Sequence, residues 1–222
     1  VSDLLNHIPF MDLTGSEIRY NKETANATAQ WYDSRDQWVE STGTHTEATA
    51  QLRILGGDVD VNQWDEDIYG NLQNQTKIAM KDKAKSIAYE FEDVFVYGDN
   101  TADSKKFSGC HVLLDSAMDV NQGSGSTGAA VSLAKLDEMI DLIKPGKPDF
   151  LMMTRLTRRN INRYYRSNAG APQVKGTEGR PLSDYNGIPI LINDFITQTE
   201  TIASGVYSAK TGGAPSAIFA MK

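Results

Sequence analysis

A long helical pattern over residues 62–97 constrains the fold of this chain more than any other feature. Apolar residues recur there at helical spacing and lysines fill the other face, so we expect one long helix. Asn62 suits the N-cap, acids follow it in the first turn, and Gly98 suits the end of the helix. At about 1.5 Å per residue such a helix is about 50 Å long, which exceeds the width of a small domain. No heptad is sustained, which favours a spine under a flat domain over a coiled coil.

The segment before this helix, residues 12–49, is polar and rich in Thr, Asn, Glu, Asp and Gln. It predicts a long β-hairpin arm, and a polar two-stranded ribbon is marginal alone in water. The arm must therefore lie on its own body or on a neighbour. Trp31, Tyr32 and Trp38 stand in it, and such aromatics seldom pack within a ribbon. We expect them to anchor an interface with an adjacent subunit, because a few aromatics carry much of an interface's energy. Packing on the chain's own body is the alternative.

The second half of the chain alternates between helical and strand-like patterns, which is typical of an α+β domain. One of its helices, beginning at Thr154, carries several arginines that could grip phosphates, bridge to a neighbour's carboxylates or face solvent. Pro189 within a strand pattern predicts a sheet edge. Strands are predicted at 111–114, 149–153, 188–192, 206–209 and 217–220, and helices over 133–143 and from Thr154 onward.

Composition excludes several classes of function. The net charge of −7 is unfavourable for tight, sequence-specific DNA binding, although loose contact with nucleic acid remains compatible with it. The single cysteine, Cys110, allows no disulfide within the chain, and the three histidines lack metal-ligand spacing. No apolar run is long enough for a membrane span, and the first residues show no secretory signal. We therefore expect no metal, no cofactor and no membrane contact.

Residues 123–128 match the G-x-G-x-x-G pattern of dinucleotide-binding loops. A dinucleotide site needs a strand directly before this loop, and residues 115–122 are polar and turn-like. The same glycines have the spacing of a Walker loop, but Ala129 stands where the lysine belongs. A flexible linker is the favoured interpretation, and a nucleotide-binding enzyme using this loop is a less favoured alternative.

Short motifs also follow one another in a recognisable order. The long helix ends in an apolar-Gly-Asp turn, and a glycine-containing apolar stretch, a helix, a strand opening a helix, and a Gly-apolar-Pro-apolar strand come after it. The residues are Phe95–Asp99, Phe107–Leu114, Leu133–Ile143, Pro148–Arg155, Gly187–Leu191 and, as a last strand, Ser216–Met221. This order resembles the major capsid protein family of tailed bacteriophages, which has the Hong Kong 97-type fold. The resemblance covers nearly the whole chain and depends on order and spacing, because no single motif is sharp.

The resemblance implies an α+β fold of the Hong Kong 97 type, with an extended β-hairpin arm, a spine helix at about 62–97 and an axial α+β domain. Its divisions would be an N-terminal segment 1–11, the extended loop 12–49, a peripheral domain with the spine helix 50–114, and the axial domain 115–222. The family normally continues with strands that complete the peripheral domain, so we expect that part to be missing from these residues.

The resemblance further implies a structural protein and not an enzyme. Its subunits would self-assemble into pentamers and hexamers of an icosahedral phage head that encloses double-stranded DNA, with portal, scaffold or decoration proteins as further partners. It would be assembled in the host cytoplasm and reside in the virion. An encapsulin-like compartment holding protein cargo is the alternative with the same fold. Some family members crosslink through a lysine of the extended loop, and Lys22 is the only lysine within residues 12–49. Most relatives lack this chemistry, so the resemblance does not imply a crosslink here. The residues expected at contacts between subunits are Lys22, Trp31, Tyr32, Trp38, Arg155, Arg158, Arg159 and Arg163.

Overall fold

The structure is a computed structural model that describes residues 3–69, 74–114, 118–122, 128–167, 184–203 and 206–222. The chain divides into two compact units. One comprises Phe10–Ile54, and the other comprises Val1–Pro9 together with Leu55–Lys222. The predicted arm lies within the first unit, which is called the arm unit below, and the second is called the body.

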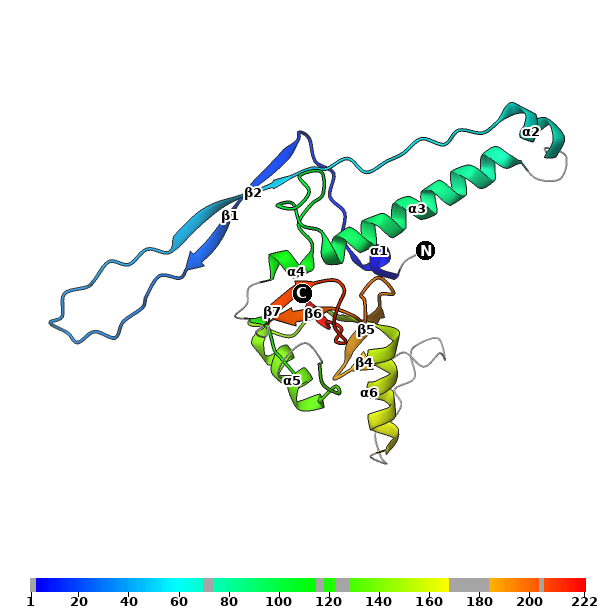
Figure 1. Ribbon diagram of the computed structural model, residues 1–222. Helices are drawn as coiled ribbons and strands as arrows, with labels where there is room; N and C mark the ends of the chain where they lie inside the picture. The colour runs from blue at the N-terminus through cyan, green and yellow to red at the C-terminus, as the bar shows by residue number, and fades with distance from the viewer. Residues whose placement is uncertain (1–2, 70–73, 115–117, 123–127, 168–183, 204–205) are drawn as a thin grey trace. The chain divides into compact units, whose positions relative to one another are not determined.

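The arm unit is a β-hairpin of β1 (Glu17–Ala25) and β2 (Thr44–Gln51), joined by a long irregular connection (Figure 1). The strands pair antiparallel from Glu17↔Gln51 to Ala25↔Thr44, with an irregularity near the connection. The structure describes all of residues 10–54, and none of their side chains is buried. The predicted hairpin with little core of its own is therefore confirmed.

The predicted spine is two helices and not one: α2 (Gln63–Tyr69) and α3 (Gln75–Tyr97). Asn62 caps α2 as predicted, since its side chain accepts a hydrogen bond from the Trp64 amide. Asn74 has an extended backbone, and its side-chain oxygen accepts from the Lys77 amide at 2.8 Å, which begins α3. A mid-pattern asparagine competes for backbone N–H groups and so favours a cap over a helix interior. The resulting α3 has 23 residues and is about 35 Å long.

The end of α3 is fixed by a close approach of two glycines. The Gly109 amide donates to the Gly98 carbonyl at 2.8 Å, and a Cβ on Gly98 would lie 2.2 Å from the Phe107 carbonyl oxygen. The short helix α4 (Cys110–Leu113) follows. This corrects the predicted strand at 111–114, because periodicity cannot separate a strand from a helical turn in so short an apolar run.

The body contains a four-stranded sheet in the order β4-β5-β3-β8, formed by Asp184–Tyr185, Ile188–Ile192, Phe150–Met153 and Phe219–Met221. Strand β3 pairs parallel with β5 and antiparallel with β8. Asn186 and Gly187 both have positive φ, as a two-residue hairpin turn between β4 and β5 requires. The prediction of a sheet edge at Pro189 is wrong, because β5 has neighbours on both sides. Proline is tolerated because the pairing of β5 with β3 begins only at Ile190.

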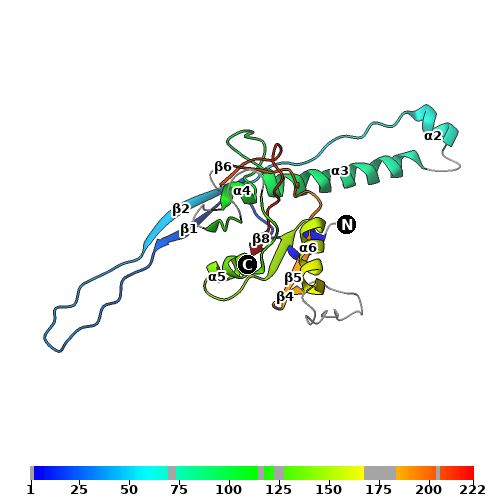
Figure 2. The same ribbon diagram turned by 60° about the horizontal axis from the view of Figure 1, so that its bottom comes forward.

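Helices cover both faces of this sheet (Figures 1 and 2). On one face, α5 (Leu133–Leu142) and α6 (Arg155–Ser167) pack on Leu151 and Met153 of β3. On the other face, Met152 packs with the end of α3 and with α1 (Asp3–His7). A separate hairpin consists of β6 (Thr201–Ala203) and β7 (Val206–Ala209). Successive side chains of β3 point to opposite faces of the sheet, which divides the core into one cluster on each face.

Candidate assembly surfaces

The aromatic side chains of the arm unit form its apolar surface. Trp31 and Trp38 are 102% and 80% exposed. The rings of Tyr32 and Trp38 stack with centroids 5.1 Å apart, and the Tyr32 hydroxyl accepts from the Val39 amide at 3.0 Å. The expectation that these aromatics would not pack within the ribbon is therefore wrong for Tyr32 and Trp38, which the irregular connection brings together. Their contact with an adjacent subunit stays a prediction.

Lys22 lies in β1 opposite Thr46 and is exposed. Its neighbour Thr24 shares a hydrogen bond of 2.8 Å between hydroxyl groups with Thr46 on the other strand. The lysine amine is thus presented to solvent by a regular part of the hairpin. Contact of Lys22 with an adjacent subunit stays a prediction.

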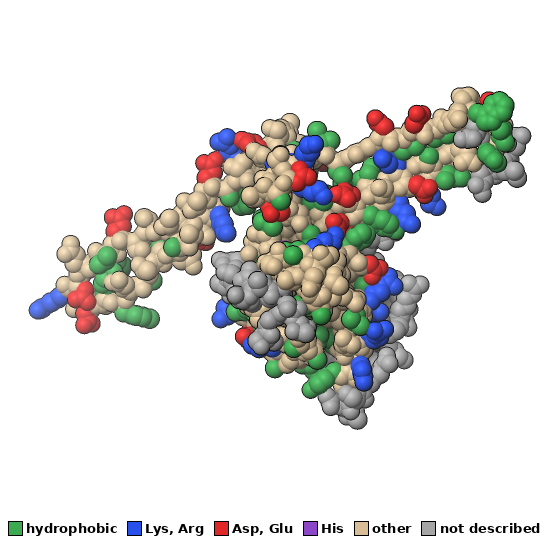
Figure 3. Space-filling model, in the orientation of Figure 1, with side chains coloured by type: hydrophobic (Ala, Val, Ile, Leu, Met, Phe, Trp, Pro, Cys, Tyr) green, Lys and Arg blue, Asp and Glu red, His purple; other side chains and the backbone are tan. Residues whose placement is uncertain are grey.

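The arginines of α6 differ in their surroundings. Both carboxylate oxygens of Asp194 accept hydrogen bonds from the Arg155 guanidinium at 2.7 Å, which raises the pKa of Arg155. Arg155 therefore has a partner within its own body, and sequence reasoning did not foresee it. Arg158 is half-buried, whereas Arg159 and Arg163 are exposed on the solvent side of the helix. Positively charged side chains gather along α6 on the face of the body seen in Figure 3.

A buried polar cluster, not predicted from the sequence, connects the end of α3 to the β6–β7 hairpin. Glu200 is 1% exposed, and its carboxylate accepts from the Tyr97 hydroxyl at 2.5 Å. The Nε2 atom of His111 lies 3.3 Å from the same carboxylate oxygen. The His111 ring stacks on Tyr207 with centroids 3.8 Å apart. The Thr197 amide in turn donates to the Tyr97 hydroxyl at 2.8 Å.

Burial raises the pKa of two tyrosines and a cysteine in or beside this cluster. It raises the pKa of Tyr97, and the hydrogen bond to Glu200 adds to the effect. It also raises the pKa of Tyr207 to about 12 and that of the neighbouring Cys110 to about 11. A thiol with so high a pKa is protonated at neutral pH and is a poor nucleophile. These features indicate a structural element joining α3, α4 and the C-terminal strands.

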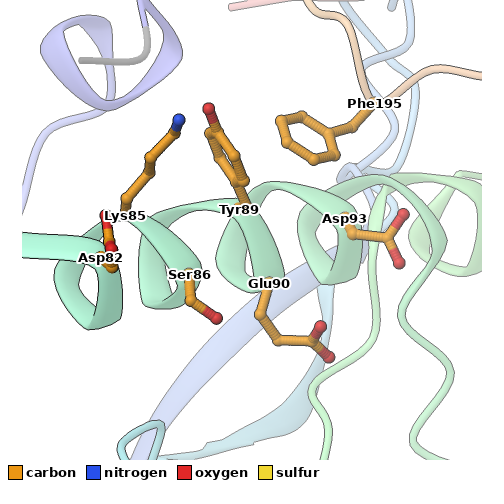
Figure 4. Close-up of a pocket in the computed structure, with 7 residues that line it drawn as sticks. All are labelled: Asp82, Lys85, Ser86, Tyr89, Glu90, Asp93 and Phe195. Carbon is orange, nitrogen blue, oxygen red and sulfur yellow. The ribbon is translucent and has the colours of Figure 1, made fainter. Parts of the chain in front are cut away.

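The described part of the body has at least two hollows. The first, of about 540 Å³, is an open depression on α3 whose lining comprises Asp82, Lys85, Ser86, Tyr89, Glu90, Asp93 and Phe195 (Figure 4). Lys106 pairs with Glu90 at 3.0 Å and Lys210 with Asp93, so lysines already neutralise two of its acids. The second, of about 580 Å³, is lined by residues of α5, α6 and β8.

Neither a metal centre nor a membrane-spanning element is found in the described part of the chain. Its His, Cys, Asp and Glu side chains form no group of three or more that could hold a metal ion. None of its helices is both long and apolar enough to cross a bilayer. The glycine-rich loop, residues 123–128, falls almost wholly outside the described residues, so its interpretation as a linker stays a prediction.

Comparisons with known proteins add to this geometry. No protein-family model and no curated protein matches the chain. Among solved structures, the holo-SrpI encapsulin complex from Synechococcus elongatus is similar at a TM-score of 0.67 and 14% identity, over 89% of this chain and 62% of that one. A structure from Mycobacterium phage Bobi is similar at 0.62 and 11% identity, over 90% and 67%. The capsid of a native GTA particle is similar at 0.62 and 13% identity, over 83% and 65%.

These likenesses identify the fold. The chain has the α+β fold of the Hong Kong 97 type that these capsid and encapsulin structures share, as the order of its motifs predicted. At such low identity the likeness extends to the fold alone. The chain spans about two thirds of the length of these structures.

Proposed function

We propose that this chain is a shell subunit, the major capsid protein of a phage-type head, and that its role is structural and not enzymatic. The observation that carries the proposal is the arm unit, which has a regular hairpin and no buried side chain among residues 10–54. A subunit that works alone has no use for such an arm, whereas a subunit that braces its neighbours needs one. The similarity of the fold to solved capsid and encapsulin subunits supports the same conclusion.

The energetics of the arm favour an intermolecular partner. A two-stranded ribbon without a packed face is marginal in water. Trp31 and Trp38 expose large apolar surfaces, which burial against a neighbour would stabilise by about 25 cal/mol per Å² of apolar area. Aromatic side chains of this kind are typical interface anchors. We infer that Trp31, Tyr32, Trp38 and Lys22 lie against an adjacent copy.

In this proposal each segment of the chain has its own structural role. Residues 12–49 are the extended arm, 50–114 the peripheral domain with the spine, 115–222 the axial domain, and 1–11 an N-terminal segment. Axial domains meet as pentamers and hexamers, and the closed icosahedral shell encloses double-stranded DNA without sequence preference. The GTA capsid with the similar fold was computed with C5 symmetry, a symmetry that a particle containing rings of five subunits can have. Portal, scaffold and decoration proteins are the further partners, and the virion, assembled in the host cytoplasm, is the location.

An encapsulin-like compartment is the second candidate. The similarity to the holo-SrpI encapsulin complex favours it, because that subunit has the same fold. The contents of purified particles separate the two functions. Nuclease-protected double-stranded DNA supports the phage head, and a stoichiometric protein cargo without nucleic acid supports the compartment.

The proposal is tested by sedimentation velocity of the natural protein, expressed in full, together with two arm variants. We expect the wild type to form particles far heavier than a single subunit. Trp31→Ser with Trp38→Ser should shift the material to small species, because the exposed apolar anchors are lost. Trp31→Phe with Trp38→Phe is the matched control and should keep most of the assembly. A wild type that stays monomeric at high concentration contradicts the proposal.

A further inference from the structure

Helix α6 is the most basic element of an acidic chain. Its 13 residues hold arginines at five positions, with no acid and no lysine among them. Arg159 and Arg163 are both exposed and lie one turn apart on the same face. Like charges at this spacing destabilise an isolated helix, so an anionic partner would relieve an unfavourable arrangement. Arg155 is already held by Asp194 within the body, which leaves Arg159 and Arg163 as the outward-facing pair of interest.

Helix α5 has the opposite character. Its acids Asp137, Glu138 and Asp141 are all exposed. Asp137 accepts from the Tyr185 hydroxyl at 2.5 Å, and Glu138 pairs with Lys135 at 2.7 Å. One lysine against three acids leaves this surface negative. Glu138 and Asp141 lie one turn apart and face away from the core residue Leu136.

The two helices belong to one body and one layer. Both pack on the same face of the sheet, through Leu136 of α5 and Ile161 of α6. The hollow of about 580 Å³ is lined by residues of both helices and so lies between them. Strands of the sheet separate them in both ribbon views (Figures 1 and 2). Each copy therefore presents a basic helix at one place and an acidic helix at another.

We propose that Arg159 and Arg163 of one copy contact Glu138 and Asp141 of the next copy, head to tail. This inference rests on the proposed shell function and names the surface through which subunits meet in a ring. Two different patches that complement each other form a heterologous interface, and such an interface gives a ring when its rotation closes. Each ion pair contributes modestly at the surface, but every subunit of a ring makes the contact twice.

Packaged DNA is the competing partner for the arginines. A phosphate backbone would pair with Arg159 and Arg163 but leave the acids of α5 unexplained. Those acids lie in the same layer and would repel a polyanion laid across it. A second copy of the chain accounts for both charged helices with one contact, so the observations favour it.

The test is a charge exchange in the natural protein expressed in full, with helical content checked by circular dichroism. We expect Arg159→Glu with Arg163→Glu, and separately Glu138→Arg with Asp141→Arg, each to lower the yield of assembled particles at least tenfold. Combining all four substitutions should restore assembly. Mixing the two double variants should restore only rings with an even number of subunits. Opposite charges then meet only where one variant contacts the other, so the two variants must alternate around the ring. Lys77→Glu with Lys81→Glu on α3 is the control for the arginine variant, because both change the net charge by the same amount.

Each result has one meaning. Wild-type yield from either double variant overturns the contact, and so does failure of the fourfold variant to recover. A control that loses assembly to the same extent shows an effect of net charge and overturns it too. Unchanged assembly with weakened binding of a duplex DNA assigns the arginines to nucleic acid instead. A wild type that never assembles contradicts the proposed function itself, so the two failures are distinguishable.

Discussion

Removing one hydroxyl group from the buried cluster should destabilise the body strongly. In Tyr97→Phe the ring remains, but Glu200 loses a donor at 2.5 Å and the Thr197 amide loses its acceptor at 2.8 Å. A hydrogen bond to a charged group contributes about 1.5–3 kcal/mol, and an orphaned buried group costs about 1–3 kcal/mol. Because Glu200 is 1% exposed, water does not replace the lost donor. We expect a loss of about 3 kcal/mol in the free energy of unfolding.

Urea unfolding of the unassembled chain, followed by circular dichroism at 222 nm, measures this loss. The signal reports the body, because the helices belong to it and the arm unit is a hairpin. With an m-value of about 2 kcal/mol per M, the midpoint should fall by about 1.5 M at constant m. Tyr89→Phe on the exposed side of α3 is the matched control and should change the free energy by less than about 0.5 kcal/mol. A Tyr97→Phe midpoint within 0.2 M of wild type, roughly the error of the method, refutes the reasoning.

Three further predictions concern packing and titration. Leu151→Ala in the centre of the sheet, where the side chain is 0% exposed, should cost about 2–5 kcal/mol in chemical denaturation. Gly98→Ala should lower the melting temperature sharply, because the new Cβ would lie 2.2 Å from a backbone carbonyl, whereas Gly56→Ala meets nothing within 4 Å and should be neutral. Stability should fall as pH rises from about 9 towards 12. The unfolded chain deprotonates first, because folding raises the pKa of Cys110 from 9.0 to about 11 and that of Tyr207 from 10.0 to about 12. Thermal unfolding across this pH range checks the sign, and a stability that rises instead contradicts it.

Much of the local structure could be predicted because it depends on neighbouring residues. The polar ribbon, the cap at Asn62 and the helix beginning at Thr154 follow from periodicity and capping chemistry. The Thr154 hydroxyl accepts from the Thr157 amide at 3.2 Å, as an N-cap does. The cap at Asn74 was missed, because the apolar spacing on both sides of it favours one continuous helix.

The remaining features depend on contacts between distant residues, which periodicity does not contain. Glu200 sits among threonines near a strand, and no local signal indicates that Tyr97 and His111 will enclose it. The pairing of Arg155 with Asp194 joins residues 39 positions apart. The stack of Tyr32 on Trp38 depends on the path of an irregular connection. Contacts between subunits involve a second copy of the chain, so the residues expected to make them remain predictions.

An electron cryomicroscopy reconstruction of the natural protein, expressed without other virion proteins, tests the account most directly. We expect closed particles in which residues 10–54 of each subunit lie across an adjacent copy, with Trp31 and Trp38 buried at the contact. A monomer, or a particle in which residues 10–54 fold back on their own body, would contradict it.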